Sequence, residues 1–267
     1  QPQGPYSYYG VVRYPDGTRY GGKPGELLRF DPAVLSDNGH IYLYTGFCPT
    51  DPWFQTVAKK IDSTIAATGN QVVELEADML TVKGDPHFLL PGRDNAAGTG
   101  FEGHELFEAS SIRKIGGRYY LVYSSINFHE LCYAVSDRPD GGFRYEGVIV
   151  SHCDLFPGKE GQPLNCFGNN HGGVECINGK YYIFYHRQTN RSMFSRQGCA
   201  EEVKILPDGS IPQVEVTSCG LNGGPLKGRG TYPATICCNL YGKLAPVFSH
   251  PLSMDSRHPY ITQDGPD

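Results

Sequence analysis

The sequence lacks the features that mark several common functional classes. No apolar run approaches the roughly 20 residues that a membrane-spanning helix needs. The formal net charge of −5 gives no electrostatic attraction to nucleic acid or to an anionic membrane surface, so neither is expected as a partner. With 39% hydrophobic and 19% charged residues, the composition is that of a globular protein with a sizeable core.

Paired cysteine motifs are also missing. The nine cysteines form no C-x-x-C pair and show no zinc-type spacing, and their number is odd. They therefore predict free, mostly buried thiols rather than a disulfide framework, which favours a cytoplasmic location. Secretion stays open, because the sequence at Gln1 does not look like a natural start.

Helical periodicity is scarce, and the best candidate is the short stretch WFQTVAKKIDSTIAAT at 53–68. What the chain has in quantity is tyrosine, glycine and proline, with 18, 34 and 20 residues respectively. Tyrosine-rich strands separated by glycine and proline turns indicate an all-β fold. Aromatic faces also stack on sugar rings, although tyrosine in a β-sheet more often serves packing.

One unit, a turn with glycine followed by an aromatic strand, occurs three times. Its copies are DNGHIYLYTG (37–46), IGGRYYLVYSS (115–125) and INGKYYIFYHR (177–187). A shorter strand-like element precedes each copy: FDPAVLS (30–36), FEASSIRK (107–114) and NNHGGVECI (169–177). A period of roughly sixty residues with about four strands per unit predicts the blades of a β-propeller.

A second repeated element places the start of the chain inside a blade. The sequence RPDGGFRYEGVIV (138–150) and the N-terminal QPQGPYSYYGVVR (1–13) share one design. We expect about three complete blades and part of another, and a closed propeller typically needs four or more. Residues 1–219 are predicted to form an N-terminally incomplete propeller. Residues 220–267 would close it or begin a C-terminal β module.

The motifs FDPAVLSDNGHIYLYTG, FEASSIRKIGGRYYLVYSS, NNHGGVECINGKYYIFYHRQ and SRQGCAEEVKILPDGSI resemble glycoside hydrolase family 43. The resemblance covers about residues 1–215. It implies a five-bladed β-propeller that cleaves arabinofuranosyl or xylosyl linkages of plant polysaccharides or oligosaccharides with inversion. The tail from 230 to 267 resembles the segment that leads into a β-sandwich in some multidomain members.

The resemblance also implies roles for four residues. Glu108 matches the general acid, and Asp31 matches the aspartate that orients the acid and tunes its pKa. His171 matches the histidine at the propeller axis, which binds substrate and helps to hold a structural calcium ion or a water. Arg187 matches an arginine that reaches the substrate. No cofactor is required. The general base lies in the family's first blade, which would precede Gln1, so no residue is assigned to it and a preceding segment or a second chain is expected to supply it.

The residues themselves support part of this assignment. Asp31, Glu108 and His171 occupy equivalent positions in successive repeats, so their side chains are expected to face one axis. Burial of Glu108 beside Phe107 and a negative charge on Asp31 would both raise the pKa of Glu108, as an acid working near neutral pH requires.

Each residue also has a structural alternative. Glu108 could instead pair with Arg113 or Lys114, and Glu105 is a competing acid in the same stretch. Asp31 could cap the turn before Pro32, His171 could be a core histidine, and Arg187 could be a structural arginine. HELFE at 104–108 is not H-E-x-x-H, which excludes a zinc peptidase of that type.

The leading expectation is an inverting, exo-acting arabinofuranosidase or xylosidase. Inverting enzymes hold their two carboxyl groups about 6.5–9.5 Å apart to admit a water. Two alternatives remain open at this point: a propeller that binds sugar without cleaving it, and a related five-bladed enzyme that hydrolyses fructosides with retention.

Overall fold

The computed structural model contains almost only β-strands. Eleven strands form three antiparallel sheets in the described part of the chain, and each sheet is a meander whose strand order follows the sequence. The described residues are 3–54, 56, 64–156, 163, 167–189, 192–217, 219–224, 227 and 229–232. Nowhere in these ranges does a helix have both the length and the apolar character for a bilayer crossing.

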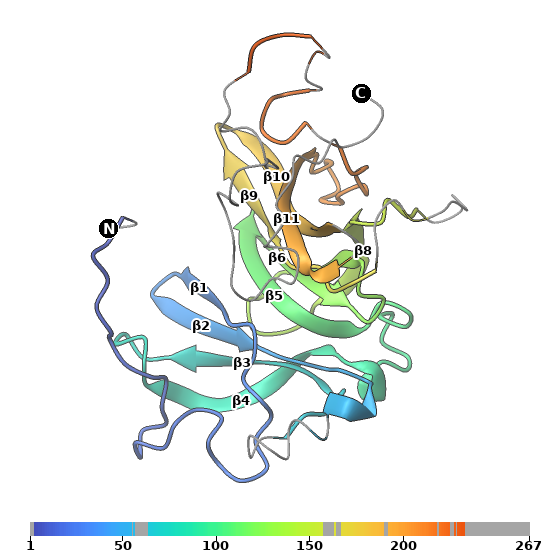
Figure 1. Cartoon of the computed structure of the whole chain (residues 1–267). Helices are drawn as coiled ribbons and strands as arrows, with labels where there is room; N and C mark the ends of the chain where they lie inside the picture. Colours follow the sequence, from blue (N-terminus) through green and yellow to red (C-terminus); the bar gives the residue numbers. More distant parts are fainter. Residues whose placement is uncertain are drawn as a thin grey trace, which may run out of the picture.

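The first sheet contains β1 (Ala33–Asp37), β2 (His40–Thr45), β3 (Gly69–Leu75) and β4 (Val82–Pro91), and the short 3₁₀ helix η1 (Arg93–Asn95) follows it. The second contains β5 (Leu106–Ile115), β6 (Arg118–Ser125), β7 (Glu130–Ser136) and β8 (Arg144–Ser151). The third contains β9 (Gly173–Ile177), β10 (Lys180–Thr189) and β11 (Ser192–Val203). The three repeats therefore correspond to three successive blades, as predicted (Figure 1).

The turn that opens each blade explains why the repeat carries its glycine. Asn38–Gly39, Gly116–Gly117 and Asn178–Gly179 all have positive φ at both positions, between 51° and 87°. Two-residue hairpins with this left-handed geometry match the twist of antiparallel strands and select Asn and Gly. The first two strands of every blade are thereby set in register by local sequence.

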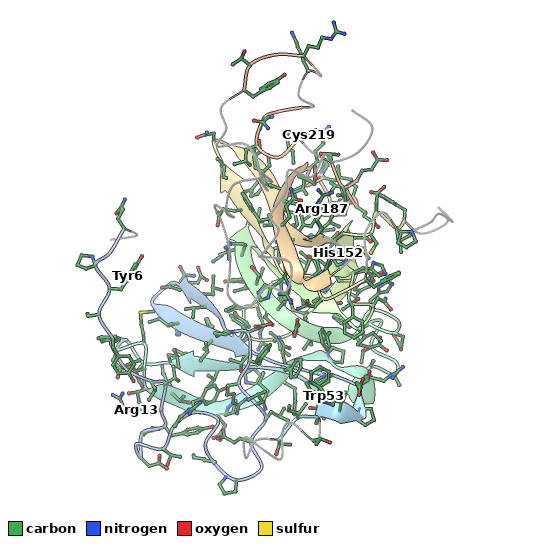
Figure 2. The ribbon with its side chains drawn as sticks, in the orientation of Figure 1. Tyr6, Arg13, Trp53, His152, Arg187 and Cys219 are labelled. Atoms are coloured by element: carbon green, nitrogen blue, oxygen red, sulfur yellow. The ribbon has the colours of Figure 1, made fainter. Side chains whose placement is uncertain are left out.

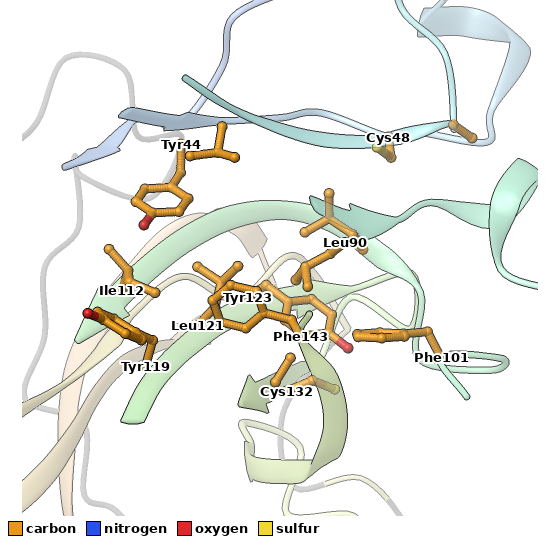
Figure 3. Close-up of a cluster of buried hydrophobic side chains, with 14 residues drawn as sticks. Tyr44, Cys48, Leu90, Phe101, Ile112, Tyr119, Leu121, Tyr123, Cys132 and Phe143 are labelled. Atoms are coloured by element: carbon orange, nitrogen blue, oxygen red, sulfur yellow. The ribbon is translucent and has the colours of Figure 1, made fainter. Parts of the chain in front are cut away.

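Apolar side chains between neighbouring blades form the core. Tyr44 and Leu90 of the first blade pack with Ile112, Leu121 and Tyr123 of the second, all nearly inaccessible to solvent (Figure 3). A second cluster joins the opposite face of the second blade to the third and includes Tyr120, Val122, Leu131, Val174, Ile183 and Tyr185. The inner strands also touch in sequence, β1 with β5 and β5 with β9. This packing brings the starts of β1, β5 and β9 close together.

The N-terminal segment differs from the expected final strand of a blade. Between residues 3 and 13 its only β-pairings are two isolated bridges of Arg13, one to Thr81 and one to Arg19. Pro5 cannot donate a hydrogen bond to a ladder, which limits strand pairing at that position. Tyr6 and Arg13 instead lie along an extended segment beside the first sheet (Figure 2).

Two other expectations fall partly outside the described residues. Of the candidate helix at 53–68, half of the positions are not described; 53, 54 and 56 are helical, whereas Thr64 pairs with Leu27 in a β-bridge. Most of the predicted segment 220–267 is likewise outside the described ranges.

The six cysteines in the described ranges form no disulfide, as predicted. Three of the six are buried, so the prediction that most thiols are buried holds for half of them. The buried ones are Cys48, Cys132 and Cys153, whereas Cys176 is exposed and Cys199 and Cys219 are intermediate.

Candidate active site

The predicted acidic residues lie where the inner strands begin. Asp31 precedes β1 by two residues, and Glu108 is the third residue of β5. The pairing of β5 with β6 shifts register on both sides of Glu108, and Ala109 has a left-handed φ of 67°. Asp31 is also left-handed, with φ 45°. Such bulges redirect side chains and persist only where surrounding structure fixes them.

Glu108 lines a cavity of about 430 Å³ with a strongly aromatic wall. Its other polar lining residues are Asn169 and Arg196. Six phenylalanines complete most of the wall: Phe30, Phe47, Phe54, Phe107, Phe128 and Phe167. The rings form a chain of contacts, with centroids 4.8 Å apart for Phe30–Phe47, 5.5 Å for Phe47–Phe107 and 4.8 Å for Phe107–Phe128. The site thus combines aromatic faces with one carboxyl group.

The surroundings of Glu108 keep its proton bound near neutral pH. Its residue exposure is 5%, and burial raises the pKa of its carboxyl to about 7. The negative charge of Asp31 acts in the same direction. Asn169 Nδ2 donates a 2.8 Å hydrogen bond to Glu108 Oε1, which opposes this rise, as does the positive charge of Arg196. Burial outweighs both.

Asp31 and His171 form the second part of the site. His171 Nδ1 lies 3.6 Å from Asp31 Oδ2, and the His171 side chain is about half exposed. Burial raises the pKa of Asp31, while His171, the backbone N–H of Ala109 and Arg196 act against this rise. The structure therefore brings Asp31, Glu108 and His171 into one neighbourhood, as their equivalent places in the repeat predicted.

The two basic residues that could have paired with Glu108 form ion pairs with other carboxylates. Lys114 Nζ lies 2.9 Å from Asp37, and Arg113 Nε lies 3.2 Å from Glu175. The competing acid, Glu105, is buried but lies outside the set of residues that lines the aromatic cavity. Of the two glutamates in this stretch, Glu108 alone borders the cavity.

Arg187 and Arg196 lie on different faces of the third blade. Arg187 is paired directly with Gln197 across the β10–β11 ladder and donates to its Oε1 at 2.8 and 3.1 Å. Arg196, one position away, is therefore on the opposite face. It lines the cavity and donates to Asn169 Oδ1 at 2.9 Å. The sequence reasoning did not identify Arg196, and the substrate role of Arg187 stays a prediction.

A calcium ion beside His171 also stays a prediction. Ca²⁺ takes about six to eight oxygen ligands. The carboxylate of Asp31 beside His171 already accepts the Ala109 N–H, and the adjacent residue, Asn170, holds a buried Oδ1 without a hydrogen-bond partner. These oxygens alone do not complete a calcium shell, and no catalytic step is derived through such an ion.

Comparisons with known proteins place these observations in context. No family model matches the chain. It is 51% identical over 273 residues to a "Xylosidase/arabinosidase" of Thermoclostridium stercorarium, covering 100% of this chain and 55% of the relative. An "Arabinoxylan arabinofuranohydrolase" of Paenibacillus polymyxa is 33% identical over 218 residues, with 75% and 30% covered. The chain thus spans about half the length, or less, of these curated relatives.

Solved structures with a similar fold include enzymes of glycoside hydrolase family 43. A glycoside hydrolase family 43 arabinoxylan arabinofuranohydrolase from Bacillus subtilis, in complex with cellotetraose, has a TM-score of 0.55 at 27% identity. The match covers 77% of this chain and 42% of that one. A family 43 β-xylosidase/α-arabinofuranosidase from a compost metagenome, in complex with xylotriose, has a TM-score of 0.53 at 25% identity, with 70% and 58% covered.

Proposed function

Because the chain belongs to glycoside hydrolase family 43, we propose that it hydrolyses arabinofuranosyl or xylosyl linkages of plant saccharides with Glu108 as the general acid. One observation carries this proposal: a carboxyl group with a pKa raised to about 7 stands in an aromatic cavity at the start of an inner strand. A carboxylic acid of this kind is protonated at mildly acidic pH and can donate its proton where an ordinary glutamate cannot.

In the proposed reaction Glu108 gives its proton to the glycosidic oxygen as the bond from that oxygen to the anomeric carbon breaks. A water attacks the anomeric carbon from the opposite face, loses a proton to a second carboxylate, and leaves the sugar with inverted configuration. Asp31 keeps Glu108 protonated through its negative charge, a positioning role that needs no contact with the sugar. We assign no residue of this chain to the base, and propose that a further segment or a second chain supplies it.

The wall of the cavity supports a sugar as the ligand. Phenylalanine faces can stack on the apolar faces of a sugar ring, as aromatic rings do on other apolar surfaces. Arg196 and Asn169 stand beside Glu108 with nitrogen donors for ring hydroxyls. His171, near Asp31, and Arg187 are proposed as further substrate contacts. The names of the relatives favour arabinose- or xylose-containing saccharides.

Substrates with different leaving groups test the role of Glu108 as general acid. Wild type and Glu108→Gln are compared on xylotriose, whose leaving group needs a proton, and on 4-nitrophenyl xyloside and arabinofuranoside, whose leaving group needs far less help. General acid catalysis contributes roughly 10²–10⁴-fold. We expect a loss of that order on the oligosaccharide and a much smaller loss on the nitrophenyl substrates, with Glu105→Gln near wild type on both.

Equal losses on both kinds of substrate would remove the acid role from Glu108. Wild type in which the base is present, on a further segment or a second chain, and which binds xylotriose without cleaving any of these substrates, would indicate a sugar-binding propeller. NMR of the anomer first released separates inversion from the retention expected of the fructoside-type alternative.

A further inference from the structure

Three potential metal ligands converge in the second blade, away from the aromatic cavity. His104 precedes β5, and Glu130 and Cys132 are the first and third residues of β7. Their ligand atoms are close: His104 Nδ1 to Glu130 Oε2 is 2.9 Å, Cys132 Sγ to Glu130 Oε2 is 3.6 Å, and Cys132 Sγ to His104 Nδ1 is 3.9 Å. An imidazole, a carboxylate and a thiol are the three kinds of side chain that bind zinc in proteins.

These separations are close to those of a tetrahedral zinc site. Zinc lies roughly 2.0–2.3 Å from nitrogen, oxygen and sulfur ligands, so two ligands at a tetrahedral angle are about 3.3–3.6 Å apart. The three observed distances bracket that range. An ion can therefore enter between the three atoms through side-chain shifts of a few tenths of an ångström, with the His104–Glu130 pair opening and the sulfur approaching.

Neighbouring groups already orient the ligands. Ser125 Oγ and Asn127 Nδ2 both donate to Glu130 Oε2, the ligand oxygen itself, at 2.7 and 3.0 Å. The His104 ring stacks on Tyr145, with centroids 4.9 Å apart and planes inclined by 12°. Outer contacts of this kind fix the direction and basicity of metal ligands.

Burial and charge also suit a divalent cation. Cys132 is fully buried and Glu130 nearly so, whereas the His104 side chain is about one-third exposed. A divalent ion bound by neutral histidine, one carboxylate and one thiolate is electrically neutral as a whole, so its burial carries little net charge cost. His104 and Glu130 also line a cavity of about 630 Å³, from which a water can complete the fourth coordination position.

From this convergence we propose that His104, Glu130 and Cys132 form a binding site for a zinc-class divalent cation. The ion would connect the loop before β5 to the start of β7. His104, in that loop, is four residues before Glu108 in the sequence. Binding of the cation at this site does not depend on glycosidase activity, so it can be measured separately. Since the thiol must lose its proton, the bond to sulfur is the most specific sign of occupancy.

The test uses the full chain after removal of metals with a chelator. Co²⁺ is added as a spectroscopic substitute, and Zn²⁺ binding is followed by calorimetry. We expect one equivalent to bind, a thiolate-to-cobalt charge-transfer band in the near ultraviolet, and a higher melting temperature with Zn²⁺. Cys132→Ser should lose the band and weaken binding by more than the roughly 10–100-fold that loss of an outer contact costs.

Two further variants keep the outcome decisive. His104→Asn retains a nitrogen donor beside Glu130 and should fold, yet bind Zn²⁺ much more weakly. Cys176→Ser removes an exposed free thiol in β9 and should bind as wild type does. The site is disproved if folded wild type shows no stoichiometric binding and no band, or if His104→Asn and Cys132→Ser both bind like wild type.

Discussion

Glu108→Gln is predicted to stabilise the protein at alkaline pH. Glutamine has nearly the same shape, keeps an oxygen for the Asn169 hydrogen bond, and cannot ionise. In the wild type the carboxyl must ionise inside an aromatic cavity once the pH exceeds its folded pKa of about 7. The substitution removes the free-energy cost of ionising a buried carboxyl. In the proposed mechanism it also removes the proton donor. Stability and catalysis are expected to change in opposite directions.

The size of the effect follows from the pKa. Glu108 ionises near 4.5 when unfolded and near 7 when folded, so the folded state holds the extra proton between these values. Stability contributed by the neutral carboxyl is therefore complete below pH 4.5 and is lost as the pH rises toward 7. At roughly 1.4 kcal/mol per pH unit, the full loss is about 3 kcal/mol.

The assay is urea denaturation of wild type and Glu108→Gln at pH 5 and pH 8. The variant should resemble wild type at pH 5 and exceed its unfolding free energy by up to about 3 kcal/mol at pH 8. Glu76→Gln, at an exposed position, serves as the matched control and should stay within about 0.5 kcal/mol at both values. The same difference between wild type and Glu108→Gln at pH 5 and pH 8 would show that folding does not raise the pKa of Glu108.

Further predictions concern the electrostatics and the packing. Asp31→Asn should move the alkaline limb of the kcat/KM profile to lower pH, because the variant lacks the charge that raises the pKa of Glu108; an unmoved limb would exclude the tuning role. Asn169→Ala should move the same limb to higher pH, because the hydrogen bond that favours the ionised form is lost. Leu121→Ala, at a fully buried position between blades, should lower the unfolding free energy by about 2–5 kcal/mol in denaturant titrations, whereas Val34→Ala, which is 47% exposed, should change it little. Gly172→Ala should destabilise the third blade, because its Cβ would lie 1.8 Å from the carbonyl oxygen of Phe184; Gly198→Ala, with open space around it, is the control in thermal melts.

Much of the blade architecture could be predicted because local sequence determines it. The Asn-Gly and Gly-Gly turns define where the first hairpin of each blade reverses, and the aromatic strands follow directly. Equivalent places in the repeat then put Asp31, Glu108 and His171 together, which the structure reproduces. The position of a residue within its repeat can be read from local sequence. Because the blades stack in order, residues at equivalent positions lie close together in the fold.

The wall of the cavity could not be predicted in the same way. Phe30, Phe54, Phe128 and Phe167 come from four separate segments between the strands, and no periodic pattern connects them. Arg196 is found only when the β10–β11 register is known, since a difference of one residue decides which face an arginine occupies. Asn169 stood within the quoted NNHGG motif, yet its hydrogen bond to Glu108 depends on the packing of two blades.

The titration of Glu108 itself is the decisive measurement of its role as a buried proton donor. NMR of the chain with ¹³C-labelled glutamate carboxyls, assigned by the loss of one signal in Glu108→Gln, gives the pKa of this group. We expect a midpoint at about 7, which moves lower in Asp31→Asn. A midpoint near 4.5, the ordinary glutamate value, would contradict the role of Glu108 as a proton donor prepared by burial.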